Sequence, residues 1–253
     1  MVLQLLTALK KERLHESAAS QIKGLIASGR LEVGQRLATE RELARRLGVS
    51  RVVVREALRS LEHSGLIEVR PGAAGGAFIT RDLHKPLSNA ARDLMNEGKL
   101  TARYFFEARR AIECSTIALA ATRAKTEDIE KLRAINRSLL RDRQENTKLR
   151  EHNAAFHIAI ANISGNPLMK LLVQSLMELL NTVFPRSAQT AAFVQNTVER
   201  HEAIIAALVK RDVALCQELM ARDTEFTVKL KRVWHGSADG PRPSRGRGRA
   251  GGR

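Results

Sequence analysis

Polar residues interrupt helical stripes that are otherwise apolar in the second half of the chain. Asn153 and His157 are four residues apart, so a helix places them on one face. His201 begins an Ile-rich stripe, and Asp223 lies between apolar residues of a further helix. Buried imidazole and carboxylate groups are costly unless they are paired or bind a metal, and ligands of these types from separate helices suit Zn²⁺. The alternative is that each histidine makes one hydrogen bond in the core and that Asp223 is exposed at its edge.

A second group of candidates is formed by Arg51, Arg55 and Arg59, which recur every four residues. On a helix this spacing aligns three guanidinium groups, and a guanidinium can donate two hydrogen bonds to O6 and N7 of guanine. Ser50 stands just before them, at a helix start where a hydroxyl and free amides can hold a phosphate. The pattern predicts a DNA-reading surface. Solvated arginines on an ordinary helical hairpin are the alternative.

The elements that position these arginines are two short helices with a boundary between them. Thr39 and Glu42 have the spacing of a capping box at the start of the first helix. Gly48 suits the left-handed residue that follows a helix, and Ser50 can cap a second helix at once. The buried stripe of that second helix is expected to be formed by Val54, Ala57, Leu58 and Leu61. Two helices joined this closely are typical of a helix-turn-helix.

A small hairpin is predicted directly after the second helix. Residues 66–69 and 77–80 are short β-prone segments, and the connection between them is rich in glycine. Glycines at 72, 75 and 76 remove side chains where a backbone would approach a phosphate surface. A hairpin in this place is the wing of a winged helix, which favours the DNA-binding interpretation over a hairpin without a partner.

Composition limits the remaining possibilities. The 253 residues are 43% hydrophobic and only 4% aromatic, so two aliphatic cores are expected. No apolar run is as long as a membrane span and the start lacks the order of a secretory signal, so we expect no membrane partner. Cys114 and Cys216 lack metal-ligand spacing and indicate a reducing compartment, the cytoplasm. The net charge of +16 is spread along the chain and not gathered in one part, so by itself it favours a polyanionic partner only weakly.

The pattern from Leu100 to Trp234 is helical almost throughout. We expect six antiparallel helices with short connections, an architecture that often encloses a ligand cavity between facing helices. The buried stripe of the first of these helices is expected to be formed by Tyr104, Ala108, Ala111, Ile112, Ser115 and Leu119. The predicted fold class is mainly α, with an N-terminal winged helix-turn-helix that carries a small β-hairpin and a C-terminal all-α antiparallel bundle.

Residues 12–81 resemble the winged-helix domain of the GntR family of bacterial transcription regulators. The matching stretch is GRLEVGQRLATERELARRLGVSRVVVREALRSLEHSGLIEVRPGAAGGAFI. Ala38 departs from the family, which usually has proline there. By this resemblance, the wing tip enters the minor groove and five residues match positions that contact an operator: Arg41, Ser50, Arg51, Arg55 and Gly72.

The helical half resembles the ligand-binding domain of the FadR subgroup of the same family. The matching pieces are EARRAIE at 107–113, FH at 156–157 with SGN at 164–166, RHEAII at 200–205 and RDVALCQELM at 211–220. Many members hold a divalent metal with one Asp and three His, and the carboxylate of an effector completes the shell. By this resemblance, the corresponding positions in this chain are Asn153, His157, His201 and Asp223.

Two of these four positions depart from the subgroup, because Asn153 replaces its Asp and Asp223 replaces its last His. Both replacements still offer oxygen, so a weaker site for a divalent metal such as Zn²⁺, Ni²⁺ or Mn²⁺ is expected. Arg109 and Glu107 match a Glu-x-Arg pattern of the subgroup. This implies that Arg109 binds the carboxylate of the effector with a two-pronged contact; a structural ion pair is the alternative.

The resemblance implies four segments. Residues 1–81 are expected to form a winged helix-turn-helix DNA-binding domain, and residues 82–100 a linker with a short helix. Residues 101–235 are expected to form an all-helical domain for effector binding and dimerisation. Residues 236–253 form a basic tail without large hydrophobic residues, which we expect to be disordered. Its arginines either only solubilise the chain or add sequence-independent attraction to DNA.

The leading hypothesis is a transcription regulator, not an enzyme, at the nucleoid of a bacterial cytoplasm. It binds an inverted-repeat DNA operator as a homodimer and responds to a small carboxylate-bearing metabolite through a divalent metal. One alternative drops the metal and fills an apolar cavity with an acyl-CoA or similarly large effector. Another is a metal-dependent helical enzyme with a nucleic-acid tether, although the sequence contains no HExxH motif and no evident Ser–His–Asp or Cys–His arrangement.

Overall fold

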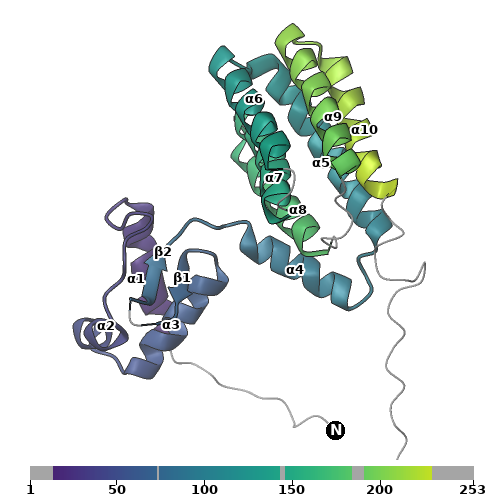
Figure 1. The fold of residues 1–253 in the computed structure, drawn as a ribbon. Helices are drawn as coiled ribbons and strands as arrows, with labels where there is room; N and C mark the ends of the chain where they lie inside the picture. Colours follow the sequence, from purple (N-terminus) through teal and green to yellow (C-terminus); the bar gives the residue numbers. More distant parts are fainter. Residues whose placement is uncertain (1–13, 73, 143–145, 184–190, 230–253) are drawn as a thin grey trace, which may run out of the picture. The chain divides into compact units, whose positions relative to one another are not determined.

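The structure is a computed structural model that divides into two compact units, Met1–Pro86 and Leu87–Arg253 (Figure 1). The residues that it describes are 14–72, 74–142, 146–183 and 191–229. The predicted basic tail, 236–253, therefore lies outside the described residues. Within the described residues the chain is mostly helical with one small antiparallel hairpin, which confirms the predicted fold class.

The first unit is the predicted winged helix-turn-helix. Its elements follow one another as α1 (Leu14–Ala27), α2 (Glu40–Leu47), α3 (Arg51–His63), β1 (Ile67–Arg70) and β2 (Gly76–Ile79). Its core is aliphatic, with Ile22 and Ile26 of α1 packed in one cluster with Val54 and Leu61 of α3 and with Ile79 of β2. The low aromatic content thus leads to a core of branched and small side chains.

The boundary between α2 and α3 forms as the capping pattern predicted. The hydroxyl of Thr39 accepts a hydrogen bond from the amide of Glu42, whose carboxylate accepts one from the amide of Thr39 at 2.9 Å. Gly48 is left-handed, with φ 66°, and ends α2. Ser50 then accepts a hydrogen bond from the amide of Val53 at 3.3 Å and begins α3. Local side-chain chemistry therefore fixes the turn that orients α3.

The wing is an antiparallel pair in which Ile67 of β1 lies opposite Ile79 of β2. A third segment, which the sequence did not predict, runs beside β2: Arg36 forms a bridge with Phe78, and the amide of Leu37 donates to the carbonyl of Ala77 at 2.8 Å. This segment ties the chain before α2 to the wing. The hairpin and the helix pair are consequently held as one body.

The second unit contains a helical bundle (Figure 1). Its elements are α4 (Lys85–Asn96), α5 (Ala102–Arg123), α6 (Thr126–Arg141), α7 (Asn146–Ile163), α8 (Pro167–Val183), α9 (Ala191–Lys210) and α10 (Val213–Lys229). Helix α4 begins just before the boundary between the units, within the segment 82–100 that was expected to connect them. Helix α5 packs against α7, α8, α9 and α10, so it runs through the interior of the bundle.

The predicted buried face of α5 is wrong. Tyr104 is 56% exposed and Ala108 is also exposed, whereas Phe105, Phe106 and Ile117 are buried. Apolar residues occur on more than one side of α5, and periodicity alone did not show which side faces the bundle. The buried side also carries the charged residues Arg109 and Glu113, and this places polar chemistry in the core.

None of the helices within the described residues is long and apolar enough to cross a membrane.

Candidate functional site

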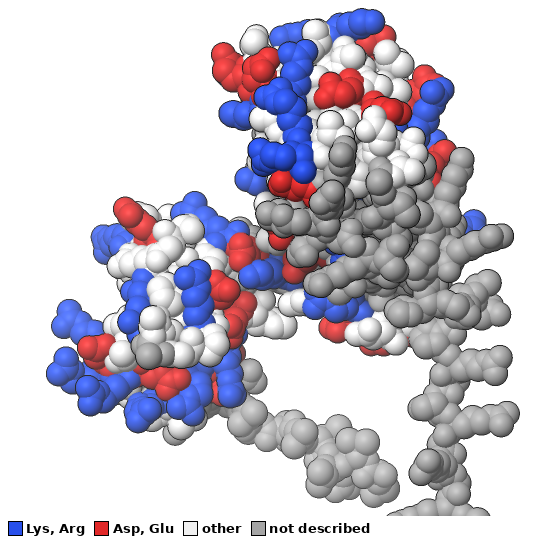
Figure 2. All heavy atoms as spheres, in the orientation of Figure 1, with Lys and Arg blue, Asp and Glu red and all other residues white. Residues whose placement is uncertain are grey.

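The first candidate surface is the helix-turn-helix with its exposed arginines. Arg41 lies on α2, while Arg51 and Arg55 lie in the first turns of α3, and all three side chains are exposed. Lys and Arg side chains occur at several places over the visible face of this unit, with acidic side chains between them (Figure 2). Ser50 is also exposed, at the N-terminus of α3 where free amides and the helix dipole favour an anion.

Arg55 is held by an acidic residue of the neighbouring helix. Its Nε and Nη2 donate to the two carboxylate oxygens of Glu40 at 3.1 and 2.9 Å. This hydrogen-bonded pair lowers the pKa of Glu40 and raises that of Arg55. Arg59, one turn later, pairs instead with Glu56 of its own helix at 2.9 Å. The three arginines of α3 are therefore not equivalent.

Two positions of the wing tip are occupied by glycine for different structural reasons. Gly72 is exposed and has φ 100°, a conformation that side chains other than glycine rarely adopt, and a Cβ there would contact nothing within 4 Å. At Gly75, in contrast, a Cβ would lie 2.2 Å from the carbonyl oxygen of Arg70. Gly75 is therefore required by close packing, while Gly72 leaves open space at the tip of the wing.

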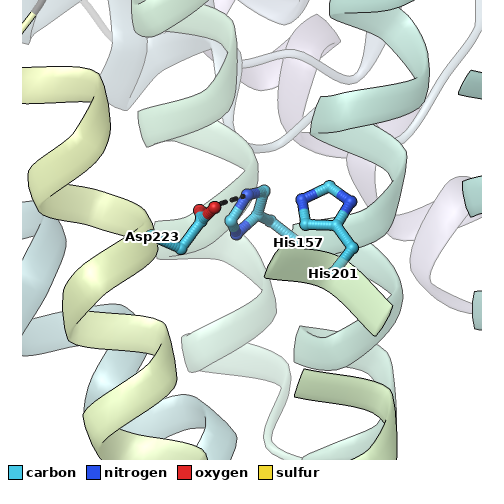
Figure 3. A group of neighbouring side chains, drawn as sticks. All are labelled: His157, His201 and Asp223. Carbon is cyan, nitrogen blue, oxygen red and sulfur yellow. Dashed lines mark ion pairs between the residues drawn. The ribbon is translucent and has the colours of Figure 1, made fainter. Parts of the chain in front are cut away.

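The second candidate site is a group of charged side chains and histidines inside the helical unit, which we call the buried polar cluster. Its members come from four helices and are Arg109 and Glu113 of α5, His157 of α7, Arg200 and His201 of α9, and Asp223 of α10. Figure 3 shows His157, His201 and Asp223 close together in the interior. One possible ligand atom from each of these three lies within 4.8 Å of the others.

His157 is oriented by a carboxylate. Its Nδ1 forms an ion-pair contact with Oε2 of Glu113, while its Nε2 lies 3.5 Å from Oδ2 of Asp223 and 3.4 Å from Nη2 of Arg109. A carboxylate at Nδ1 favours the tautomer that carries its proton there, which leaves the lone pair on Nε2. Burial would raise the pKa of Glu113, but the charges of Arg109 and His157 outweigh it and lower that pKa.

His201 is fully buried, and among the described residues neither of its ring nitrogens has a hydrogen-bond partner. Its ring stacks on Phe156, with centroids 3.7 Å apart and planes 5° from parallel. Burial lowers its pKa to about 3, so it is neutral near pH 7. Unsatisfied buried nitrogens cost free energy, and a bound ion is one way to satisfy one of them.

Asp223 is an ionised carboxylate within the bundle. Its Oδ1 accepts a hydrogen bond from Nε of Arg200 at 2.9 Å, and its Oδ2 lies 3.9 Å from Nη2 of Arg109. Burial would raise its pKa, but the neighbouring histidines and guanidinium groups lower it to about 2. The guanidinium groups of Arg109 and Arg200 contribute to this stabilisation.

The structure brings together three of the four metal-ligand positions expected from the sequence. Asn153, the fourth, is half-buried on α7, one turn before His157. Arg109 lies within the buried polar cluster, is 0% exposed and donates from Nε to Glu113 at 2.5 Å. Sequence reasoning missed Glu113 and Arg200, although each had a signal. Glu113 is four residues after Arg109, and Arg200 directly precedes His201.

A separate groove of about 720 Å³ lies between α5 and α10. Phe106, Ala111 and Cys114 line it from α5, and Ala221 and Thr224 line it from α10. Charged residues of both signs, which include Arg110 paired with Glu225, complete the walls. Its volume lies within the range of small-molecule sites.

Comparison with known proteins gives consistent matches over both units. Residues 14–78 match the family described as bacterial regulatory proteins, gntR family, and residues 104–226 match the FCD domain. The chain is 30% identical over 226 residues to the putative L-lactate dehydrogenase operon regulatory protein of Escherichia coli (strain K12). The aligned region covers 85% of this chain and 84% of that protein. It is also 30% identical to the Uxu operon transcriptional regulator of the same strain, with 87% of each chain covered.

A solved structure, Streptococcus agalactiae GntR, shares the fold with a TM-score of 0.59 and 23% identity, over 85% of this chain and 99% of that one. The relatives are named as regulators of transcription, and regulators of this family are DNA-binding proteins rather than enzymes, which removes the enzyme alternative. The chain belongs to the GntR family of bacterial regulatory proteins, with an FCD domain as its helical half.

Proposed function

We propose that this DNA-binding regulator recognises an inverted-repeat operator as a homodimer and senses a small carboxylate-bearing metabolite through a divalent metal in its buried polar cluster. Such a protein acts at the bacterial nucleoid. The metal would lie between helices α7, α9 and α10, so that its binding and that of the acid affect how these helices pack. A ligand that binds one arrangement of the protein better than another shifts the population that fits DNA.

The proposed DNA contacts come from the helix-turn-helix and the wing. Arg51 and Arg55 would read base edges in the major groove, Arg41 and Ser50 would hold phosphates, and the backbone at Gly72 would approach the minor groove. Their exposure in the structure supports this assignment. A two-fold symmetric dimer requires two such surfaces on half-sites about one helical turn apart, hence an inverted repeat.

The operator proposal is tested by selecting DNA from a random pool with the full chain and sequencing the bound fraction. We expect enrichment of a short inverted repeat, with each half-site lost when its guanines are replaced. Enrichment of one asymmetric half-site would contradict the dimer, and no enrichment over the starting pool would contradict sequence-specific recognition altogether.

The observation that carries the metal proposal is His201, whose ring nitrogens are buried and have no hydrogen-bond partner among the described residues. A divalent ion would be held by a ring nitrogen of His201, by Nε2 of His157 and by the carboxylate of Asp223, with Asn153 as a fourth ligand. When bound, the ion supplies positive charge to which the carboxylate of an effector can bind. Arg109 borders the same space, because its Nη2 lies within 4 Å of His157 and Asp223.

Metal analysis of protein purified without a polyhistidine tag tests this site. Wild type should retain about one equivalent of a transition metal, Zn²⁺, Ni²⁺ or Mn²⁺, and His157→Ala should lose it. His152→Ala is the matched control, because His152 lies on the same helix but pairs with Asp142 outside the cluster. Equal metal content in all three proteins, whether high or near zero, would contradict the proposal.

The groove between α5 and α10 favours a second candidate effector, a larger molecule such as an acyl-CoA. Its apolar lining, which includes Phe106 and Ala111, would suit an acyl chain, and Arg103 is a lining cation that could contact an anionic head. An acyl-CoA that raises the melting temperature equally with and without a chelator would support this candidate. A shift that chelator abolishes would support the metal-bound acid instead.

A further inference from the structure

Apart from its two histidines, the buried polar cluster contains two anions and two cations. The anions are the carboxylates of Glu113 and Asp223, and the cations are the guanidinium groups of Arg109 and Arg200. Histidine binds a metal only in its neutral form, so His157 and His201 add no charge to a metal-bound cluster. The cluster is thus electrically balanced by its own side chains.

Arg200 is responsible for part of this balance at the carboxylate of Asp223. It comes from α9, next to His201, and its Nε donates to Oδ1 of Asp223 at 2.9 Å while its Nη2 donates to Thr197 at 3.0 Å. The side chain of Arg200 is 21% exposed, compared with 4% for Asp223. A cation that reaches toward solvent therefore neutralises the carboxylate that would otherwise compensate a metal ion.

The charge count decides which ligands this interior can accept. A divalent cation added to a balanced cluster leaves two uncompensated positive charges among side chains shielded from water, which is unfavourable. A monocarboxylate bound to the ion removes one of these charges, and a dianion removes both. The anion that best completes the cluster therefore carries two negative charges close enough together to contact one metal ion.

We propose that the buried polar cluster binds a divalent cation together with a chelating dianion, of the dicarboxylate or hydroxydicarboxylate class, and that each ligand strengthens the binding of the other. This inference rests on the metal site proposed above and deepens it by naming the class of acid. Arg200 is the residue that sets the required charge, because its guanidinium neutralises the ligand carboxylate of Asp223. By linkage, the dianion strengthens metal binding by the same factor as the metal strengthens binding of the dianion.

Equilibrium dialysis of the full chain against buffered free zinc tests the inference, with malonate as the dianion and acetate as the monoanion. Free zinc is fixed in each arm, so that chelation in solution does not enter, and bound zinc is measured by mass spectrometry. Malonate should lower the apparent dissociation constant for zinc about tenfold or more, within the usual range of coupling between two ligands. Acetate should lower it less than about threefold.

Three variants separate charge from shape. Arg200→Gln removes the positive charge, so zinc alone should bind about tenfold more tightly and acetate should approach the effect of malonate. Arg200→Lys keeps the charge and should behave as wild type. Arg222→Gln is the matched control, because Arg222 is an exposed arginine of α10 that pairs with Glu218. Melting temperature and circular dichroism confirm that each variant is folded.

The outcomes distinguish this inference from the metal site on which it rests. If zinc binds but acetate and malonate act equally in wild type, or if Arg200→Gln binds zinc as wild type does, the dianion inference is wrong and the metal site stands. If no protein binds zinc in any arm, the metal site itself is wrong and the inference falls with it.

Discussion

Arg55 on α3 donates two hydrogen bonds to Glu40 on α2, so a residue expected to read bases is held by a carboxylate of the neighbouring helix. The contact has two consequences for DNA binding. It fixes the plane of a guanidinium that must match two acceptors on guanine, and it adds a negative charge beside a surface that must approach phosphates. Glu40 should therefore favour discrimination between sequences at the expense of affinity.

Glu40→Gln tests this balance. Affinity for a scrambled duplex should rise severalfold because a negative charge is removed, while the ratio of operator to scrambled affinity should fall about tenfold because Arg55 is no longer oriented. Fluorescence anisotropy with the two duplexes measures both. The unfolding free energy should change by less than about 1 kcal/mol, since the pair is half-exposed. Glu56→Gln, which releases only Arg59, is the control, and an equal loss of discrimination there would contradict the special role of Glu40.

Arg51→Ala and Arg55→Ala should each reduce discrimination between operator and scrambled DNA by about 1–3 kcal/mol, the value of a two-pronged base contact. Both variants should melt as wild type does, because these side chains are exposed. Arg133→Ala, at a partly exposed arginine of α6 in the helical unit, is the control. Retained sequence preference in both α3 variants would show that another element reads the bases.

The helix-turn-helix could be predicted from sequence because its limits depend on local chemistry. Hydrogen bonds to nearby backbone amides begin the two helices, at Thr39 with Glu42 and at Ser50, and the left-handed Gly48 ends the first. All of these effects act within a few residues, so the helix limits do not depend on distant packing. The segment at Arg36 was missed because its bridge to Phe78 joins residues far apart in the chain.

The buried polar cluster could be predicted only in part. His157, His201 and Asp223 stood out because they interrupt apolar stripes, and the structure does bring them together. Glu113 and Arg200 did not stand out, because charged residues on helices are usually exposed. Their burial depends on α5 and α9 facing His157 and Asp223, which only the assembled bundle determines.

Glu113 should act as a positioning residue for His157. Glu113→Gln removes the carboxylate that favours a proton on Nδ1, so affinity for zinc, with malonate present, should fall about 10- to 100-fold. It also leaves the buried charge of Arg109 less compensated, so the unfolding free energy should fall by about 3 kcal/mol. Glu107→Gln, at an exposed glutamate of the same helix, should change neither quantity. Zinc affinity that is unchanged in Glu113→Gln would contradict the positioning role.

His201 gives the metal-free protein a specific dependence on pH. Its folded-state pKa of about 3 lies below the ordinary value of 6.5, so the unfolded chain gains a proton at higher pH than the folded chain. The unfolding free energy should therefore fall as pH decreases from 6.5 toward 3, by up to about 1.4 kcal/mol per pH unit, and His201 adds no pH dependence above that window. Asp223 acts in the same direction only below about 3.8, so the range from 6.5 to 4.5 excludes its contribution.

Urea denaturation of chelator-treated protein at several pH values between 7.5 and 4.5 measures this slope. His201→Phe, which keeps a flat ring against Phe156, should lose most of the slope between 6.5 and 4.5. His152→Gln is the control, because His152 is partly exposed and paired with Asp142. A slope in His201→Phe as steep as in wild type would mean that other groups control acid stability.

The measurement that tests the metal-sensing account most directly is the melting temperature of the full chain with zinc and malonate, before and after addition of a chelator. At about 100 times the dissociation constant, binding should add about 2.7 kcal/mol, which is roughly 5–10 °C for a chain of this size. Wild type and His152→Ala should show this shift and lose it with chelator, while His201→Ala should show none. An equal shift in His201→Ala, or no shift in wild type, would contradict the claim that the buried polar cluster is a metal site.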